Sequence, residues 1–193
     1  ETPGMPSSLL ERRKTRLDLE LYGPQFDFVT GEERFSAFIG GIGTGKTVAG
    51  SVKCIVEIDK IRTKHSEPSL GLVIAPTYPM LRDATLRTFR EVVGDAMVNF
   101  HKSDLIATMV DGSEIMFRSA EDPDKLRGPN LDWVWMDEGS LCHRGTWDIV
   151  IGRLRRGGRA GKIWITSTPK GRNWLYEKLD LLHIHKARTK DNP

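Results

Sequence analysis

Apolar residues along this chain gather into short continuous runs, which are separated by longer polar or amphipathic stretches. Continuous runs of about four to eight apolar residues are typical of strands that are covered on both faces, as in a parallel sheet. We expect such strands at four places, in the segments RFSAFIG (34–40), LGLVIAP (70–76), LDWVWMDE (131–138) and KIWITSTP (162–169).

The stretches between these runs favour helices and turns. The segments expected to be helical are residues 9–22, 46–62, 80–93 and 145–155. The first of them is expected to end near Gly23-Pro24. Residues 105–120 hold two strand-like runs divided by Asp111-Gly112, a dipeptide that favours a hairpin turn. This alternation predicts a single α/β domain, in which helices flank a mostly parallel central sheet with an added antiparallel hairpin.

The composition is that of an ordinary globular domain. The chain has 193 residues, of which 38% are hydrophobic and 28% charged, and this length is enough for one domain with its own core. No apolar run approaches the ~20 residues of a membrane span, so we expect no membrane partner. Cys54 and Cys142 form no C-x-x-C pair, and we expect reduced thiols packed in the interior of an intracellular protein.

The charge is mildly positive and unevenly distributed. A formal net charge of +3 permits a nucleic-acid partner without favouring one. Basic residues are concentrated in residues 11–16 (ERRKTR) and 153–162 (RLRRGGRAGK). Each segment either contacts nucleic-acid phosphates or forms an ordinary solvated face, and the sequence leaves both interpretations open. The candidate DNA contacts are Arg153, Arg155, Arg156 and Arg159.

A glycine-rich segment, GGIGTGKT, follows the first apolar run and precedes a predicted helix. It matches G-x-x-x-x-G-K-[ST], in which backbone N–H groups and the following helix N-terminus bind phosphate groups. We expect Lys46 to reach the β- and γ-phosphates of ATP and the Thr47 hydroxyl to ligate Mg²⁺. The alternative is a glycine-rich turn without a ligand. The expected ATP-binding residues of this loop are Gly40, Gly41, Ile42, Gly43, Thr44, Gly45, Lys46 and Thr47.

Two adjacent acids, Asp137 and Glu138, close the apolar run at 131–138. In an open parallel sheet the ligand crevice lies at the carboxyl ends of the strands, so both acids are expected there. Asp137 would hold Mg²⁺ directly or through water, and Glu138 would polarise an attacking water. The alternative is that the acids cap the next helix. A small-molecule kinase needs no water-activating base, so the pair favours a nucleoside triphosphate hydrolase.

Polar residues also close the run at 162–169. Ser167 and Thr168 are expected to bond the γ-phosphate or the attacking water, and Pro169 ends the strand. A plain exit from the strand into a turn is the alternative. The three segments together are the layout of motor-type ATPases, which use neighbouring strands to hydrolyse the nucleotide and to sense hydrolysis.

The order of GGIGTGKT, VWMDE, TSTPKG and the closing TKDNP resembles the ATPase domain of the large terminase subunit of tailed bacteriophages, over nearly the whole chain. The resemblance implies a P-loop NTPase fold of the ASCE type, which hydrolyses ATP with Mg²⁺. In YGPQFDF it implies that Gln25 contacts the adenine base, and in DKLRG that Arg127 acts as an arginine finger in trans. An ordinary loop residue and a surface ion pair with Asp124 are the respective alternatives. Some terminases carry an arginine within the phosphate loop, and its absence here places more weight on Arg127.

The resemblance also implies partners and a larger protein. We expect double-stranded DNA, the portal protein of the procapsid, the small terminase subunit and further copies in a ring as partners, in the host cell cytoplasm. Residues 1–8 are expected to be a flexible leader and residues 186–193 the start of a linker to a nuclease domain that this chain lacks, so we expect no DNA cleavage by it. A helicase-type nucleic-acid-dependent ATPase and a non-hydrolysing nucleotide-binding adaptor remain alternatives.

Overall fold

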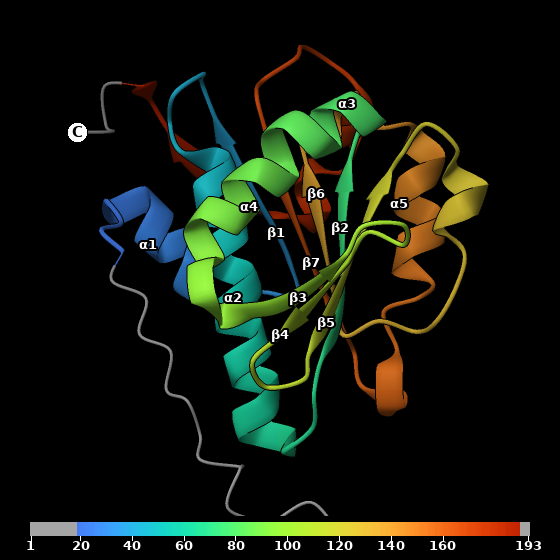
Figure 1. Ribbon diagram of the computed structural model, residues 1–193. Helices are drawn as coiled ribbons and strands as arrows, with labels where there is room; N and C mark the ends of the chain where they lie inside the picture. Colours follow the sequence, from blue (N-terminus) through green and yellow to red (C-terminus); the bar gives the residue numbers. More distant parts are fainter. Residues whose placement is uncertain (1–18, 190–193) are drawn as a thin grey trace, which may run out of the picture.

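The computed structural model describes residues 19–189, which form an eight-stranded sheet with helices on both faces (Figure 1). The strands in chain order are β1 (Phe35–Gly40), β2 (Leu70–Ala75), β3 (Met97–His101), β4 (Ile106–Met109), β5 (Glu114–Ser119), β6 (Trp133–Asp137), β7 (Lys162–Ser167) and β8 (His183–Ala187).

The helices are of three kinds. The α-helices are α1 (Gly23–Thr30), α2 (Lys46–His65), α3 (Tyr78–Met80), α4 (Leu86–Val93), α5 (Arg144–Ile151) and α6 (Trp174–Glu177). A π-helical turn, η2 (Leu81–Thr85), joins α3 to α4. The 3₁₀ turns are η3 (Gly94–Ala96), η4 (Pro123–Leu126), η5 (Gly139–Leu141), η6 (Arg156–Gly158) and η7 (Leu179–Leu181).

The strands follow the order β3-β4-β5-β2-β6-β7-β1-β8 across the sheet. Neighbours from β5 to β8 in this order are parallel, whereas β3 and β4 are antiparallel additions at one edge. The predicted α/β fold and the antiparallel hairpin are therefore confirmed. Strand β7 lies between β1 and β6, so the glycine-rich loop and the acidic pair are placed two strands apart at the same edge.

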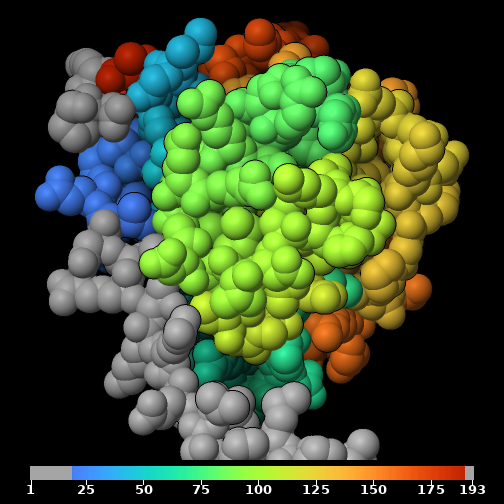
Figure 2. Space-filling model, in the orientation of Figure 1, coloured from blue at the N-terminus to red at the C-terminus, as the bar shows by residue number. Residues whose placement is uncertain are grey.

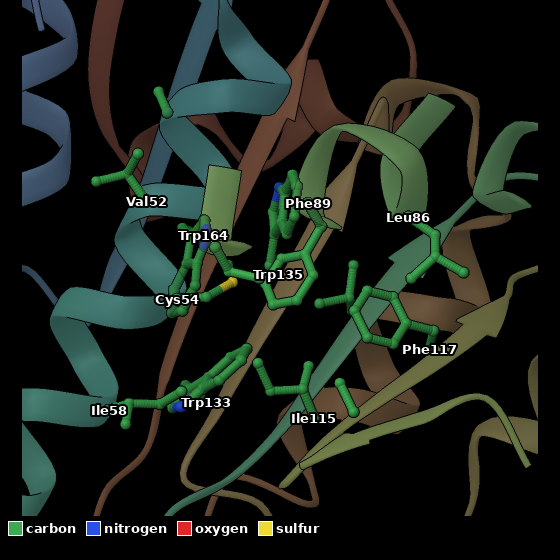
Figure 3. Close-up of a cluster of buried hydrophobic side chains, with 14 of the residues drawn as sticks. Val52, Cys54, Ile58, Leu86, Phe89, Ile115, Phe117, Trp133, Trp135 and Trp164 are labelled. Carbon is green, nitrogen blue, oxygen red and sulfur yellow. The ribbon is translucent and has the colours of Figure 1, made fainter. Parts of the chain in front are cut away.

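Residues of β6 alternate between two hydrophobic clusters, one on each face of the sheet. Trp133 and Trp135 pack on the side of α2 and α4, where the Trp133 ring stacks on Trp164 at 5.1 Å (Figure 3). Val134 and Met136 pack on the side of α5 and α6. Because both faces are covered, the strand has no polar alternation, and this is why its sequence is continuously apolar. The segment from α3 through β4 covers the face toward the viewer (green in Figure 2).

Helix α2 approaches the sheet closely at Gly50. A Cβ atom at this position would lie 2.3 Å from Cε2 of Trp135, a fully buried ring whose Nε1 donates to Thr166 Oγ1 at 2.8 Å. Alanine normally stabilises a helix interior by about 0.5–1 kcal/mol relative to glycine. Here we expect Gly50→Ala to lower the free energy of unfolding instead, by about 1–3 kcal/mol, because the ring must move.

Urea unfolding measures this effect. Gly23→Ala is the control, because a Cβ atom at Gly23 has no neighbour within 4 Å. Equal stability of Gly50→Ala and the unchanged chain would contradict the close approach of α2 to the sheet.

The two cysteines agree with the prediction. Cys54 and Cys142 are both free and buried. Burial raises the pKa of both thiols, that of Cys142 to about 12, so both stay protonated and unreactive at neutral pH. None of the helices within residues 19–189 has the length and apolarity needed to cross a bilayer.

Several predicted boundaries were wrong. Residues 19–22 are not helical and a helix starts at Gly23, with Pro24 in its first turn, where proline's missing N–H costs nothing. Residues 9–18 of that segment, the leader at 1–8 and the basic residues 11–16 lie outside the described residues. The helix predicted at 145–155 ends at Ile151. The predicted helix at 80–93 is present, with the π-helical turn near its start.

The sheet also contains two edge strands that the sequence did not predict, β3 and β8. Both carry polar residues at most positions, because an edge strand is only partly covered. The expected linker at 186–193 therefore starts too early. Lys186 and Ala187 belong to β8 and pair with Ile39 and Gly40 of β1.

Candidate active site

The glycine-rich loop connects β1 to α2, as the sequence predicts. Gly43 and Gly45 have φ angles of +81° and +66°, in the left-handed region that favours glycine. Turns of this kind point successive N–H groups to one side, where they form an anion-binding concavity. The first N–H groups of α2, which begins at Lys46, have no partner within the helix. Loop and helix together therefore form a site suited to phosphate groups.

Lys46 lies between the loop and the acidic pair. Its Nζ atom donates a hydrogen bond to the Gly41 carbonyl at 2.8 Å and stands 3.8 Å from Oε1 of Glu138. The side chain is only 7% exposed. The loop after β1 and the end of β6, 90 residues apart in sequence at Thr47 and Asp137, thus meet in one site.

Residues before α1 and within it support the loop. The Tyr22 hydroxyl donates to the Thr44 carbonyl at 2.7 Å. The Gln25 amide donates to the carbonyl of Gly45 at 3.2 Å, and Gln25 is buried. Gln25 therefore belongs to the site, but its amide contacts the loop itself. A contact with the adenine base stays a prediction.

Three threonine hydroxyls surround the Asp137 carboxylate. Thr85 donates to Oδ2 and Thr166 to Oδ1, both at 2.7 Å, and Thr47 lies 3.3 Å from each oxygen. Burial raises the pKa of Asp137, and the hydrogen bonds from Thr85 and Thr166 oppose this effect by stabilising the charged form. The carboxylate lies directly behind the Thr47 hydroxyl.

Glu138 is held by the end of β7. Its carboxylate accepts hydrogen bonds from the Thr168 backbone N–H at 3.1 Å and from the Thr168 hydroxyl at 3.0 Å. Glu138 has a φ of +47°, a left-handed conformation that is unfavourable for a residue with a side chain. Such conformations concentrate at functional sites, where the surrounding structure holds them.

The rest of the predicted sensing segment lies beside this contact. The Ser167 hydroxyl accepts from the Ser140 backbone N–H at 3.1 Å, and Pro169 follows in the turn after β7. The turn after β6 and the turn after β7 are therefore joined by hydrogen bonds on both sides of Glu138.

Arg127 is on the surface at the end of η4. Its side chain is 70% exposed, and Nε lies 3.0 Å from Oδ1 of Asp124. Within one chain the structure thus shows the surface ion pair that the sequence left as an alternative. An action on the site of a neighbouring subunit stays a prediction.

The candidate DNA contacts Arg153, Arg156 and Arg159 lie at the opposite end of the sheet from the loop. Arg153 is 7% exposed, and its guanidinium donates to the carbonyls of Pro129, at 2.9 Å, and Leu126. The expectation that Arg153 contacts DNA is therefore wrong, because a buried guanidinium cannot meet a phosphate backbone.

The other arginines of this segment have partners as well. Arg156 and Arg159 bind the two oxygens of the buried Asp132 at 2.8 and 2.9 Å, so they hold the start of β6. Arg155 donates to the Asn130 side chain at 3.1 Å and is exposed, and its contact with DNA stays a prediction.

Sequence reasoning missed three threonines of the site. Thr85 has no local motif and reaches Asp137 from the π-helical turn, a type of turn that is common at functional sites. Thr166 precedes the predicted sensing residues by one position. Thr189 donates to the Ile42 carbonyl at 3.1 Å, which brings the segment after β8 onto the loop.

A phosphate-type loop after β1, an acidic pair after β6 and a strand between them define the class of the protein, a P-loop NTPase of the ASCE type. The sequence profile described as "Phage terminase large subunit" matches residues 32–192. The chain therefore belongs to the phage terminase large subunit family.

Individual relatives agree with this assignment. The chain is 31% identical over 159 residues to the large terminase subunit of Thermus phage G20c, which covers 69% of this chain and 30% of that protein. The chain thus spans about a third of the length of the curated relatives it matches. The ATPase domain of the large terminase of Thermus phage P74-26 has 28% identity and a TM-score of 0.64, and covers 82% of this chain and 68% of that one.

A further structure shares the fold. It is the large terminase of another thermophilic bacteriophage, in complex with ATP-gamma-S, with 19% identity and a TM-score of 0.69, and it covers 90% of this chain and 46% of that one.

Proposed function

We propose that this chain is the ATP-hydrolysing part of a motor that moves viral double-stranded DNA into a procapsid. The observation that carries the proposal is the convergence of Lys46, Asp137 and Glu138, from two distant segments, on one glycine-rich loop. Membership of the terminase family favours this function over that of a helicase-type ATPase. The complex of a thermophilic bacteriophage terminase with ATP-gamma-S supports nucleotide binding at this fold.

The residues of the site fit Mg²⁺ and ATP. The loop offers backbone N–H groups to the phosphates, and Lys46 offers a positive charge that already bonds an oxygen, the Gly41 carbonyl. The Thr47 hydroxyl would ligate the metal, and Asp137, which lies behind Thr47, would act through a water. Bound Mg²⁺ would neutralise negative charge on the β- and γ-oxygens.

Glu138 is the group that activates water in this proposal. Its carboxylate is oriented by Thr168 and faces the Lys46 ammonium, so one oxygen lone pair is directed into the site. A proton leaving the attacking water passes to this carboxylate. Because Thr168 follows β7 directly, a change in the orientation of Glu138 is passed to the loop of Ser167, Thr168 and Pro169, which we propose as the coupling segment.

The partners of the whole motor are part of the proposal. We propose that the chain acts with the portal protein, the small terminase subunit and further copies of itself in a ring, in the host cell cytoplasm. Arg127 would serve the site of the neighbouring copy. These assignments are supported by the family alone.

Substitution of Lys46 tests the nucleotide site. Lys46→Ala is expected to weaken ATP binding by roughly 10- to 100-fold, because a hydrogen bond to a charged group contributes about 1.5–3 kcal/mol. Equilibrium binding of ATP in the presence of Mg²⁺ measures this. Lys64→Ala, an exposed lysine at the other end of α2, is the matched control and should bind ATP normally. Equal affinity of both variants would place the nucleotide elsewhere.

A further inference from the structure

A second group of chemically reactive side chains lies at the edge of the sheet formed by β8. It consists of Glu33, in the connection between α1 and β1, and of His183 and His185 in β8. One ligand-capable atom of each residue lies within 4.8 Å of those of the other two. None of the three belongs to the nucleotide site described above.

The backbone explains why these side chains meet. His183 and His185 are two residues apart in a strand, so they point to the same face. Their ring centroids are 4.8 Å apart, and the ring of Phe28 meets His185 edge-on at 5.5 Å, which fixes the orientation of that imidazole. Glu33 fits because residue 31 is a glycine, since a Cβ atom there would lie 2.3 Å from Glu33 Oε2.

Two polar atoms of the group are shielded from solvent and lack a hydrogen-bond partner among the described residues, Glu33 Oε2 and His185 Nε2. Buried polar atoms are paired in most proteins, because an unpaired one costs about 1–3 kcal/mol. Two such atoms in one cluster therefore indicate a ligand. The remaining close contact is between His183 Nε2 and Glu33 Oε1, at 3.5 Å.

The donor set and its spacing suit a transition metal. Ligands at about 2.0–2.1 Å from a tetrahedral Zn²⁺ are separated by about 3.3 Å, close to the distance between His183 and Glu33. Two imidazoles and one carboxylate are ligands that zinc prefers. Burial, with a smaller contribution from His183, lowers the pKa of His185, so its imidazole is neutral and free to coordinate at neutral pH.

We propose that Glu33, His183 and His185 bind one divalent transition metal ion of the zinc class, with solvent completing its coordination. The metal would tie edge strand β8, next to the strand that leads into the phosphate loop, to the connection that follows α1. It would act as a clamp on the fold and not as a participant in ATP hydrolysis.

Cobalt(II) titration of the full 193-residue chain tests the proposal. Excess Mg²⁺ fills oxygen sites such as the one near Asp137 but does not compete for imidazole nitrogen. We expect a visible absorption band that saturates at one Co²⁺ per chain and disappears when Zn²⁺ is added. His183→Ala and Glu33→Gln should each lose the band. The His183 side chain is 57% exposed, so its removal should not unfold the protein.

His101→Ala is the matched control, because His101 is an exposed histidine in β3, at the other edge of the sheet. It should keep the band. In thermal unfolding, Zn²⁺ should raise the Tm of the unchanged chain and of His101→Ala but not of His183→Ala. Absence of a one-to-one band, its survival in His183→Ala and Glu33→Gln, or its loss in His101→Ala would each overturn the proposal and leave a simple histidine–carboxylate pair.

Discussion

Glu138→Gln is expected to leave ATP affinity unchanged and to lower kcat for ATP hydrolysis by roughly 10²–10⁴-fold, the usual contribution of a positioned general base. The Glu138 carboxylate accepts two hydrogen bonds from Thr168, at 3.0 and 3.1 Å, so its orientation is fixed. A glutamine side chain of the same shape keeps an acceptor for Thr168, but its amide cannot take a proton from water.

Phosphate release at saturating ATP gives kcat, and equilibrium binding gives the ATP affinity. Glu114→Gln is the control, because Glu114 is exposed at the start of β5, at the opposite end of the sheet. A normal rate in Glu138→Gln would remove Glu138 from the role of base. A rate of zero in the unchanged chain and in the assembled motor would favour the non-hydrolysing adaptor.

Arg127→Ala is expected to lower ATP hydrolysis by the assembled ring by roughly 10³–10⁵-fold, the contribution of an arginine finger to phosphoryl transfer. Arg127 is 70% exposed and pairs with the equally exposed Asp124 at 3.0 Å. An exposed pair of this kind contributes about 0–1 kcal/mol. Arg127 can therefore leave Asp124 at little cost and reach the negative charge that develops on the γ-phosphate of a neighbouring copy.

Mixed rings separate action in trans from action in cis. Rings of Arg127→Ala alone or Glu138→Gln alone should be nearly inactive, whereas a mixture should regain part of the hydrolysis. Rescue arises because some interfaces join an intact Glu138 to an intact Arg127 from the next copy. The experiment needs full-length protein under packaging conditions.

The control for the mixed rings is Lys125→Ala, which removes an exposed cation from the same 3₁₀ turn and should be fully active alone. Mixed assembly is shown independently by differently labelled subunits. Mixed rings that form but stay inactive would exclude the trans role of Arg127.

The sequence by itself determined the strands β1, β2, β6 and β7 and the loop between β1 and α2. Strands buried on both faces are continuously apolar, and the left-handed turns of the loop require glycine, so both leave a local record. The positions of Lys46, Asp137 and Glu138 at one edge follow from the same record, because parallel strands bring their carboxyl ends together. Edge strands β3 and β8 leave a weaker pattern because water covers part of them.

Only the tertiary structure decided which side chains complete the site and which do not belong to it. Asp137 receives hydrogen bonds from Thr85 and Thr166, in separate elements, and no spacing in the sequence announces such a contact. The arginines at 153, 156 and 159 resemble a DNA-binding segment in sequence, yet they hold buried carbonyls and the carboxylate of Asp132. The physical reason is that the role of a charged side chain depends on its burial and its partner, and both are set by segments that lie far away along the chain.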